Sequence, residues 1–122
     1  MIFNFFKKKA NNTSSSTPSY EQAILIYLDG TGLSDDVYKN YDLMTLEDNI
    51  NKVIQPAGLG IYDGDESGGE GTTVYLYSHD AEKLLSAIKP ILQSYPLCNR
   101  ARVVIQKDQS GSNDREEVIV QK

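Results

Sequence analysis

The feature that most constrains the fold of this chain is the order in which two hydrophobic periods alternate along it. The segment QAILIYLDG, residues 22–30, is an almost continuous apolar run, as expected for a strand buried on both faces. Apolar residues then recur at helical spacing in two later segments, 45–58 and 80–95. These segments predict two helices, the first opened by Thr45 in a capping box and the second by Asp80 as N-cap.

Four shorter runs of β-branched and aromatic residues predict two hairpins. The runs 59–62 and 71–78 flank the sequence YDGDESGGEG, residues 62–71, which places four carboxylates and four glycines in ten positions. Its Asp-Gly and Gly-Gly pairs favour a wide turn, because glycine adopts positive φ without steric strain. The runs 101–107 and 115–121 are joined by the turn-rich sequence DQSGSND and predict a closing hairpin.

The resulting order of strand, helix, strand, strand, helix, strand, strand predicts an α+β fold. It is the ferredoxin-like split βαβ two-layer sandwich with one strand added at the end. Right-handed crossovers place the third strand between the first two and the fourth on the other side of the first. The expected sheet is mostly antiparallel, in the order 2, 3, 1, 4, 5, with both helices on one face. The other face would carry either Tyr75 and Tyr77 or Val74 and Leu76, and is a second candidate surface.

The first 18 residues differ in composition from the rest of the chain. Asn, Ser and Thr dominate once three consecutive lysines end, and no apolar period follows. We therefore expect a disordered tail over residues 1–18 and a single α+β domain over residues 19–122. Contact of Phe3, Phe5 and Phe6 with a membrane surface is the minor alternative for the tail, because one short apolar cluster binds weakly.

Nothing in the sequence predicts a membrane span, because no apolar run approaches the length that crosses a bilayer. The apolar run 2–6 is shorter than the core of a secretory signal and precedes its lysines instead of following them. Cys98 is the single cysteine, so no internal disulfide forms. A cytoplasmic location is the resulting expectation.

The charge balance favours a basic protein partner over nucleic acid. Beyond residue 18 the chain has nine basic and seventeen acidic residues, a formal net charge of −8. Such a surface repels a phosphate backbone, so nucleic acid is not expected as a partner. The same charge attracts a basic protein. No pattern in the sequence predicts the oligomeric state.

The predicted topology brings acidic residues to one edge of the sheet, where the first two strands end and the third begins. We predict that the following residues form an acidic rim that binds the partner: Asp29, Asp35, Asp36, Asp63, Asp65, Glu66 and Glu70. The turn before the fourth strand arrives at the same end and brings Cys98 and Arg100 with it. One positive group would then face many negative ones.

Binding of a metal ion or a small ligand at this rim is the alternative function. The sequence DGDESG begins like a calcium loop. Its candidate ligands are Asp63, Asp65 and Ser67. The twelfth position of such a loop should hold Glu and holds Val74 instead, so a strong site of this type is not expected. A looser site would need Asp29 or Asp35 from the neighbouring loop to complete its shell.

No combination of side chains compels catalysis, although the sequence offers three alternatives. His79 before Asp80 could act as an oriented base, but a histidine next to a helix N-cap is usually a surface residue. Arg100 could lower the pKa of Cys98, but an isolated cysteine usually packs in the core. Clustered carboxylates need a cleft to act as acid and base, so a hydrolase ranks third. With one histidine and one cysteine, neither a transition metal nor another cofactor is predicted.

Residues 58–92, GLGIYDGDESGGEGTTVYLYSHDAEKLLSAIKPIL, resemble a set of small uncharacterised bacterial proteins that share the pattern glGe.DG.e.GgGe..ly.yg.DA..L...i.pvL. The chain departs from this pattern at His79, where the pattern has Gly. The resemblance implies a ferredoxin-like fold and, by analogy with small acidic proteins of this layout, an immunity or antitoxin function. The sequence thus predicts a non-catalytic, acidic protein-binding domain that neutralises a basic toxin.

Overall fold

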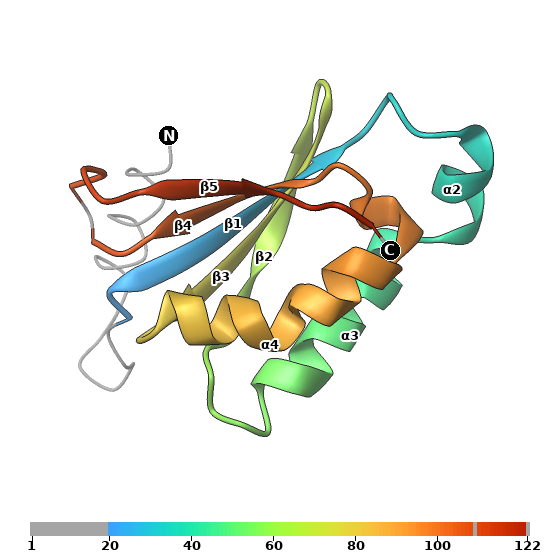
Figure 1. The fold of residues 1–122 in the computed structure, drawn as a ribbon. Helices are drawn as coiled ribbons and strands as arrows, with labels where there is room; N and C mark the ends of the chain where they lie inside the picture. Colours follow the sequence, from blue (N-terminus) through green and yellow to red (C-terminus); the bar gives the residue numbers. More distant parts are fainter. Residues whose placement is uncertain (1–19, 109, 122) are drawn as a thin grey trace.

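The computed structural model describes residues 20–108 and 110–121, so the tail expected over residues 1–18 lies outside the described residues. The strands are β1 (Gln22–Asp29), β2 (Ile61–Gly68), β3 (Gly71–Ser78), β4 (Arg102–Gln106) and β5 (Arg115–Val118). The helices are α2 (Asp35–Asn40), α3 (Leu43–Ile54) and α4 (Ala81–Ser94), followed by a short 3-10 turn, η1 (Pro96–Cys98). Figure 1 shows α3 and α4 side by side on one face of the sheet.

The strands form one open antiparallel sheet in the order β2-β3-β1-β4-β5. Both the predicted α+β architecture and the predicted strand order are confirmed. β1 pairs with β3 along its whole length, from Gln22 opposite Ser78 to Asp29 opposite Gly71. This register brings the end of β1 beside the start of β3, and it positions the site described below.

The main core lies between the sheet and the two long helices. Alternate residues of β1, Ile24 and Ile26, are fully buried in it. The helices contribute Leu46, Ile50, Ile54, Leu84, Leu85, Ile88 and Leu92. Burial of a side chain of this size stabilises a fold by about 1.5–3 kcal/mol before conformational entropy is subtracted, so these two amphipathic stripes fix both helices on the same face.

The opposite face of the sheet carries a smaller apolar cluster. Ala23 and Leu25 of β1 are buried there together with Tyr77, and Tyr75 is packed against them. Val74 and Leu76, the other pair considered for this face, are fully buried in the main core. The alternation of β3 therefore assigns the tyrosines to the face without helices, which we call the open face.

The acidic sequence DGDES is a strand and not the wide turn that the sequence predicts. β2 pairs with β3 from Ile61 to Gly68, with a register shift between Tyr62 and Gly64, so only Gly69 and Glu70 remain in the turn. Gly69 has φ 44° and Gly64 has φ 122°, backbone conformations that residues other than glycine rarely adopt. The glycines of this stretch thus serve a bulge and a tight turn.

The helix boundaries differ from prediction at two places. α3 begins two residues before Thr45, and its cap is Asp42, whose carboxylate accepts hydrogen bonds from the backbone N–H and the hydroxyl of Thr45. α4 is capped by Asp80, as predicted. α2 is not predicted and buries none of its residues. Within the described residues, no helix is long and apolar enough to cross a membrane.

Candidate functional site

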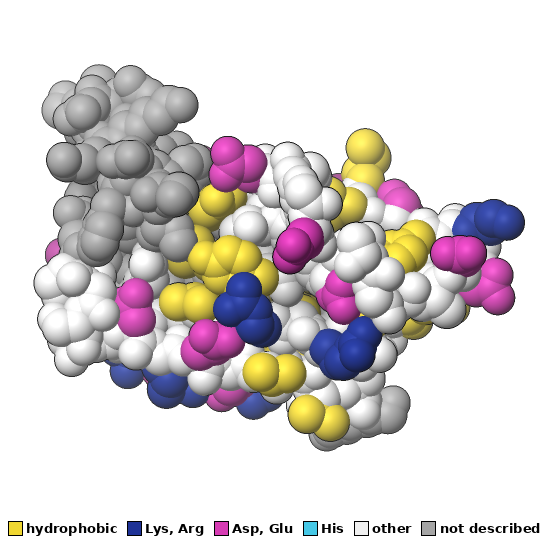
Figure 2. Space-filling view, turned by 90° about the horizontal axis from the view of Figure 1, so that it is seen from above, with side chains coloured by type: hydrophobic (Ala, Val, Ile, Leu, Met, Phe, Trp, Pro, Cys, Tyr) yellow, Lys and Arg dark blue, Asp and Glu magenta, His cyan; other side chains and the backbone are white. Residues whose placement is uncertain are grey.

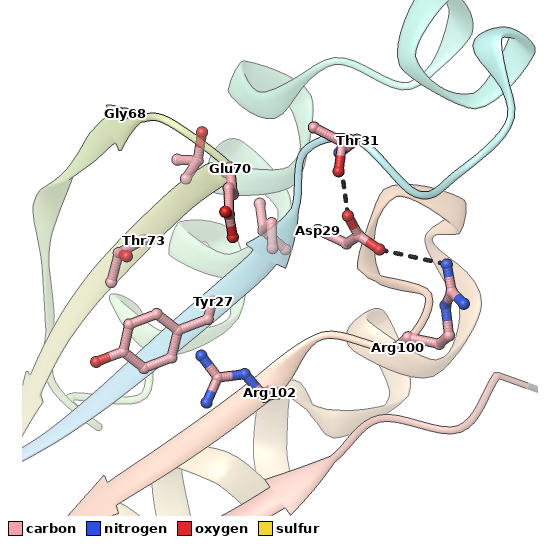
Figure 3. Close-up of a pocket in the computed structure, with 11 residues that line it drawn as sticks. Tyr27, Asp29, Thr31, Gly68, Glu70, Thr73, Arg100 and Arg102 are labelled. Carbon is pink, nitrogen blue, oxygen red and sulfur yellow. Dashed lines mark hydrogen bonds and ion pairs between the residues drawn. The ribbon is translucent and has the colours of Figure 1, made fainter.

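A pocket of about 380 Å³ lies where β1 ends and where β3 and β4 begin. Figure 3 shows its polar side chains, which come from these strands and from the turns beside them. Those that matter for its chemistry are Tyr27, Asp29, Glu70, Thr73, Arg100 and Arg102. Arg100 and Glu70 were expected at this end of the sheet, whereas Tyr27, Thr73 and Arg102 were not singled out from the sequence.

Tyr27, Thr73 and Arg102 share one row of the open face, because Tyr27 is opposite Thr73 on β3 and opposite Arg102 on β4. The Arg102 guanidinium carbon lies 4.8 Å from the centre of the Tyr27 ring, a cation–π contact. Its Nη1 donates to Glu116 Oε2 at 3.3 Å. Burial raises the pKa of the Tyr27 phenol, and the nearby Arg102 charge opposes this effect. Contacts with the Tyr27 ring and with Glu116 therefore both orient the Arg102 side chain.

Asp29 organises the turn that follows β1. Its Oδ1 accepts the backbone N–H groups of Thr31 and Gly32 at 3.0 and 2.8 Å, an Asx-turn. These two hydrogen bonds, and then the charge of Arg100, hold the pKa of the Asp29 carboxyl below its usual range. Its backbone oxygen accepts a hydrogen bond from the Tyr38 hydroxyl at 2.8 Å, which ties α2 to the sheet.

Arg100 completes this corner of the pocket. Its Nη2 donates to Gly32 O at 3.0 Å and to Asp29 Oδ2 at 3.3 Å. The backbone of Arg100 has φ 64°, and among the described residues it is the one non-glycine residue with positive φ. This left-handed conformation is uncommon for a long side chain. The turn from η1 into β4 therefore aims Arg100 at the end of β1.

Glu70 stands on the other side of the pocket, in the β2–β3 turn (Figure 3). The Gly30 N–H donates to the Glu70 carbonyl oxygen at 2.9 Å and holds this turn against the end of β1. The approach is close: a Cβ atom on Gly71 would lie 2.1 Å from the Leu28 carbonyl oxygen. Only glycine fits at Gly71, so packing requires the glycine that ends the acidic stretch.

The acidic residues Asp63, Asp65 and Glu66 lie along a paired strand, and not in a loop beside Asp29 as the predicted arrangement assumes. Asp63, Asp65 and Glu66 follow one another along β2, an edge strand, at about 3.3 Å per residue. Consecutive side chains of a strand point to opposite faces. Asp35 and Asp36 are exposed in the first turn of α2. The predicted set therefore occupies three places: the pocket, β2 and α2.

On the helix side of β2, the carboxyl groups of Glu47 and Asp65 lie beside the Tyr62 hydroxyl. The Tyr62 hydroxyl donates to Asp65 Oδ2 at 3.1 Å. Glu47 of α3 lies beside both, and its Oε2 is buried without a hydrogen-bond partner among the described residues. Burial, and then the neighbouring Asp65, raises the pKa of Glu47 to about 7. Glu47 therefore holds its proton in slightly acidic solution.

On the open face, the Tyr75 hydroxyl donates to Glu66 Oε1 at 2.9 Å. Burial, and then this carboxylate, raises the pKa of Tyr75 to about 12, so the phenol stays protonated. Ser67 Oγ is hydrogen-bonded to Thr72 Oγ1 at 2.8 Å. Within the described residues no group of three or more His, Cys, Asp or Glu side chains is placed to hold a metal ion. Asp63, Asp65 and Ser67 are thus candidate ligands on a paired strand, not in a loop.

The two other candidate residues, Cys98 and His79, lie in the core and on the surface respectively, the positions that the sequence favours. Cys98 is fully buried, and burial raises the pKa of its thiol to about 12, so Arg100 does not activate it. His79 is exposed and its ring lies 4.6 Å from the ring of Tyr20. Neither residue lines the pocket.

Charge is divided unevenly between the two halves of the chain. Residues 20–80 contain twelve acidic and two basic residues, whereas residues 81–122 contain five acidic and seven basic residues. Most basic side chains of the second half are in ion pairs on β4, β5 and α4: Lys89, Arg102, Lys107 and Arg115 bind Glu82, Glu116 and Glu117. Negative charge therefore outweighs positive charge over β2, α2 and α3, and Figure 2 shows acidic side chains beside a basic one at the right-hand end of the molecule, where α2 lies.

Fold and site together define a small α+β domain with a polar pocket at one end of its strands. Comparisons of the chain with protein-family models, with curated proteins and with solved structures found no match.

Proposed function

We propose that this chain is a non-catalytic protein-binding domain whose acidic half, residues 20–80, binds a basic protein partner. The uneven division of charge is the observation that carries this proposal, because ion pairs compensate the acidic side chains of β4, β5 and α4, whereas β2, α2 and α3 together carry seven acidic and two basic residues. Complementary charge raises the rate of association and selects against acidic competitors. An immunity-type protein that neutralises a basic toxin in the cytoplasm is the most concrete form of the proposal, and the resemblance of residues 58–92 supports it.

α2 offers the sharpest test of this surface. Asp35 and Asp36 are exposed, they belong to a helix that buries none of its residues, and no ion pair to either is found among the described residues. Their replacement by asparagine removes two charges with little effect on the fold, since exposed substitutions of this kind change stability by less than about 0.5 kcal/mol. The double variant Asp35→Asn/Asp36→Asn therefore separates binding from folding.

The assay uses a candidate partner, namely a basic protein encoded by a gene next to that of this chain, first in a growth-rescue experiment and then by stopped-flow association at low and high salt. The double variant should slow association about tenfold at low salt and flatten its salt dependence. The matched control is Asp114→Asn/Glu116→Gln, which removes two exposed acidic charges beside and within β5, outside the acidic half. If the control slows association as much as the α2 variant, or if neither changes it, the acidic half is not the binding surface.

A further inference from the structure

We infer that the pocket at the end of β1 binds a small zwitterion, which presents a carboxylate to Arg100 and Arg102 and an ammonium group to Glu70, as a free amino acid does. The inference does not depend on the proposed protein partner, because it concerns a different ligand and a different group of side chains. Figure 3 shows the two arginines on the β4 side of the pocket and Glu70 on the β2–β3 side.

The arginines retain donors for a ligand. The hydrogen bonds found among the described residues use one terminal nitrogen of each side chain, Nη2 of Arg100 and Nη1 of Arg102. A guanidinium carries five N–H donors in a planar fork that matches the two oxygens of a carboxylate. Arg102 is further fixed against the Tyr27 ring, so its remaining N–H groups are oriented before a ligand arrives.

The backbone of Arg100 is an independent sign that this side chain is placed for binding. The left-handed conformation is strained for a residue with a long side chain, and glycine would adopt φ 64° without that strain. Strain of this kind concentrates at sites that bind ligands, where the side chain is needed. The Arg100 side chain is 58% exposed and contributes little packing, so its aim toward Asp29 and the pocket is the feature that a glycine would lose.

The charge of the pocket favours a zwitterion over a plain anion. A simple anion would approach a chain of net charge −5 and would meet Glu70 across the pocket. The Asp29 carboxylate is already bound by three donors. The Glu70 carboxylate, in contrast, makes no hydrogen bond or ion pair found among the described residues and is exposed. An ammonium group beside Glu70 would convert this repulsion into attraction.

The size of the pocket limits the ligand. About 380 Å³ lies near the lower end of the volumes of small-molecule sites, so an amino acid fits better than a nucleotide or an oligosaccharide. The Tyr27 and Thr73 hydroxyls line the floor on the open face. They offer neutral hydrogen bonds to a polar ligand without adding charge.

Nuclear magnetic resonance titration of the full chain tests the inference. The probes are L-alanine, L-glutamine, acetate and methylammonium, which separate the zwitterion from each of its charged halves. We expect saturable shifts at Tyr27, Thr73 and Arg102 for at least one amino acid, with affinity at least tenfold higher than for acetate or methylammonium. No saturable shift with any amino acid up to about 10 mM overturns the inference. Acetate binding as tightly as the amino acids also overturns it, because the site would then be an anion site only.

Variants then assign the two ends of the ligand. Arg100→Gly should weaken amino-acid binding at least tenfold and keep the melting temperature within a few degrees, since glycine accepts this backbone. Glu70→Gln should weaken amino-acid binding about tenfold and leave acetate binding unchanged or tighter. Arg115→Gln, which removes one positive charge outside the pocket, should leave binding unchanged. If Arg115→Gln weakens binding as much as Arg100→Gly, net charge and not the pocket is responsible. Should Arg100→Gly fail to fold, Glu70→Gln at its exposed turn decides alone, and unchanged amino-acid affinity in it refutes the assignment.

Discussion

Replacement of Glu47 by glutamine tests whether the protonated side chain of Glu47 holds β2 against α3. Burial raises the pKa of Glu47 first, and the hydrogen bond and charge of Asp65 raise it further, from its usual 4.5 to about 7. The Tyr62 hydroxyl acts in the opposite direction, and Asp48 adds a smaller repulsion. Glutamine keeps the shape of the protonated side chain and still donates a hydrogen bond to Asp65, but it never ionises.

The sign of the effect follows from linkage. Because the folded-state pKa is raised, protonation of Glu47 stabilises the fold fully below about pH 4.5, and this contribution is lost as the pH rises toward 7. At 1.36 kcal/mol per pKa unit the shift corresponds to at most about 3 kcal/mol. Glu47 is only partly buried, so screening by water reduces this to about 1 kcal/mol. Above pH 7 the ionised Glu47 side chain should therefore weaken the contact between β2 and α3.

The assay is urea unfolding of the wild type and of Glu47→Gln at about pH 4.5 and pH 8. The variant should match the wild type at the lower pH and exceed its free energy of unfolding by about 1 kcal/mol at the higher pH. Asp48→Asn is the matched control, because it removes an exposed charge from the next position of α3 and should give less than about 0.5 kcal/mol at either pH. A gain of equal size at both pH values, or a loss at pH 8, would refute the stabilising role of the Glu47 proton.

Three further outcomes are expected. Gly71→Ala should lower the free energy of unfolding by more than about 2 kcal/mol in urea, because its Cβ would lie 2.1 Å from the Leu28 carbonyl oxygen; an alanine that is tolerated would show that β1 and β3 can separate there. Cys98 should react with a thiol reagent only as fast as the protein opens, because burial raises its pKa to about 12; rapid reaction in native buffer would contradict the buried position. Calorimetric titration with calcium should show no saturable binding at micromolar concentrations, and saturable heat that Asp63→Asn/Asp65→Asn abolishes would establish the alternative function.

The topology could be predicted because the long apolar segments are strongly periodic. The run 71–78 coincides with β3, and Asp80 caps α4 as its position predicts. Once five strands and two helices are placed in order, right-handed crossovers leave few arrangements of the sheet. The strand order β2-β3-β1-β4-β5 follows from these rules.

The extent of β2 and the presence of α2 could not be predicted from local sequence. The residues from Asp63 to Gly68 carry no apolar alternation, and they are a strand because their backbone pairs with β3. α2 is six residues long and buries no side chain of its own. It is held by hydrogen bonds between Tyr38 and two backbone groups, Asp29 O and Leu33 N. Both elements depend on contacts that a single sequence does not display.

The pocket could be predicted only in part. Glu70 and Arg100 are found at the sheet edge where the topology places them. Tyr27, Thr73 and Arg102 are far apart in sequence, and only the register of β1 with both neighbours sets them in one row. That register was a usable signal, since each strand assignment fixes which residues alternate onto the open face. The left-handed backbone of Arg100 could not be predicted, because an arginine in the sequence does not indicate positive φ.

The position of β2 also bears on how a partner would meet the acidic half. An edge strand presents unpaired backbone groups that attract other strands, and proteins protect such edges with bulges and charged side chains. β2 has both features. Its register shifts between Tyr62 and Gly64, and it carries three carboxylate side chains, those of Asp63, Asp65 and Glu66. Strand addition at this edge is therefore disfavoured, and a basic partner would be attracted by side-chain charge instead. Binding of that kind loses strength as salt is raised, whereas a strand added through backbone hydrogen bonds would not, so the salt dependence of the complex distinguishes the two modes.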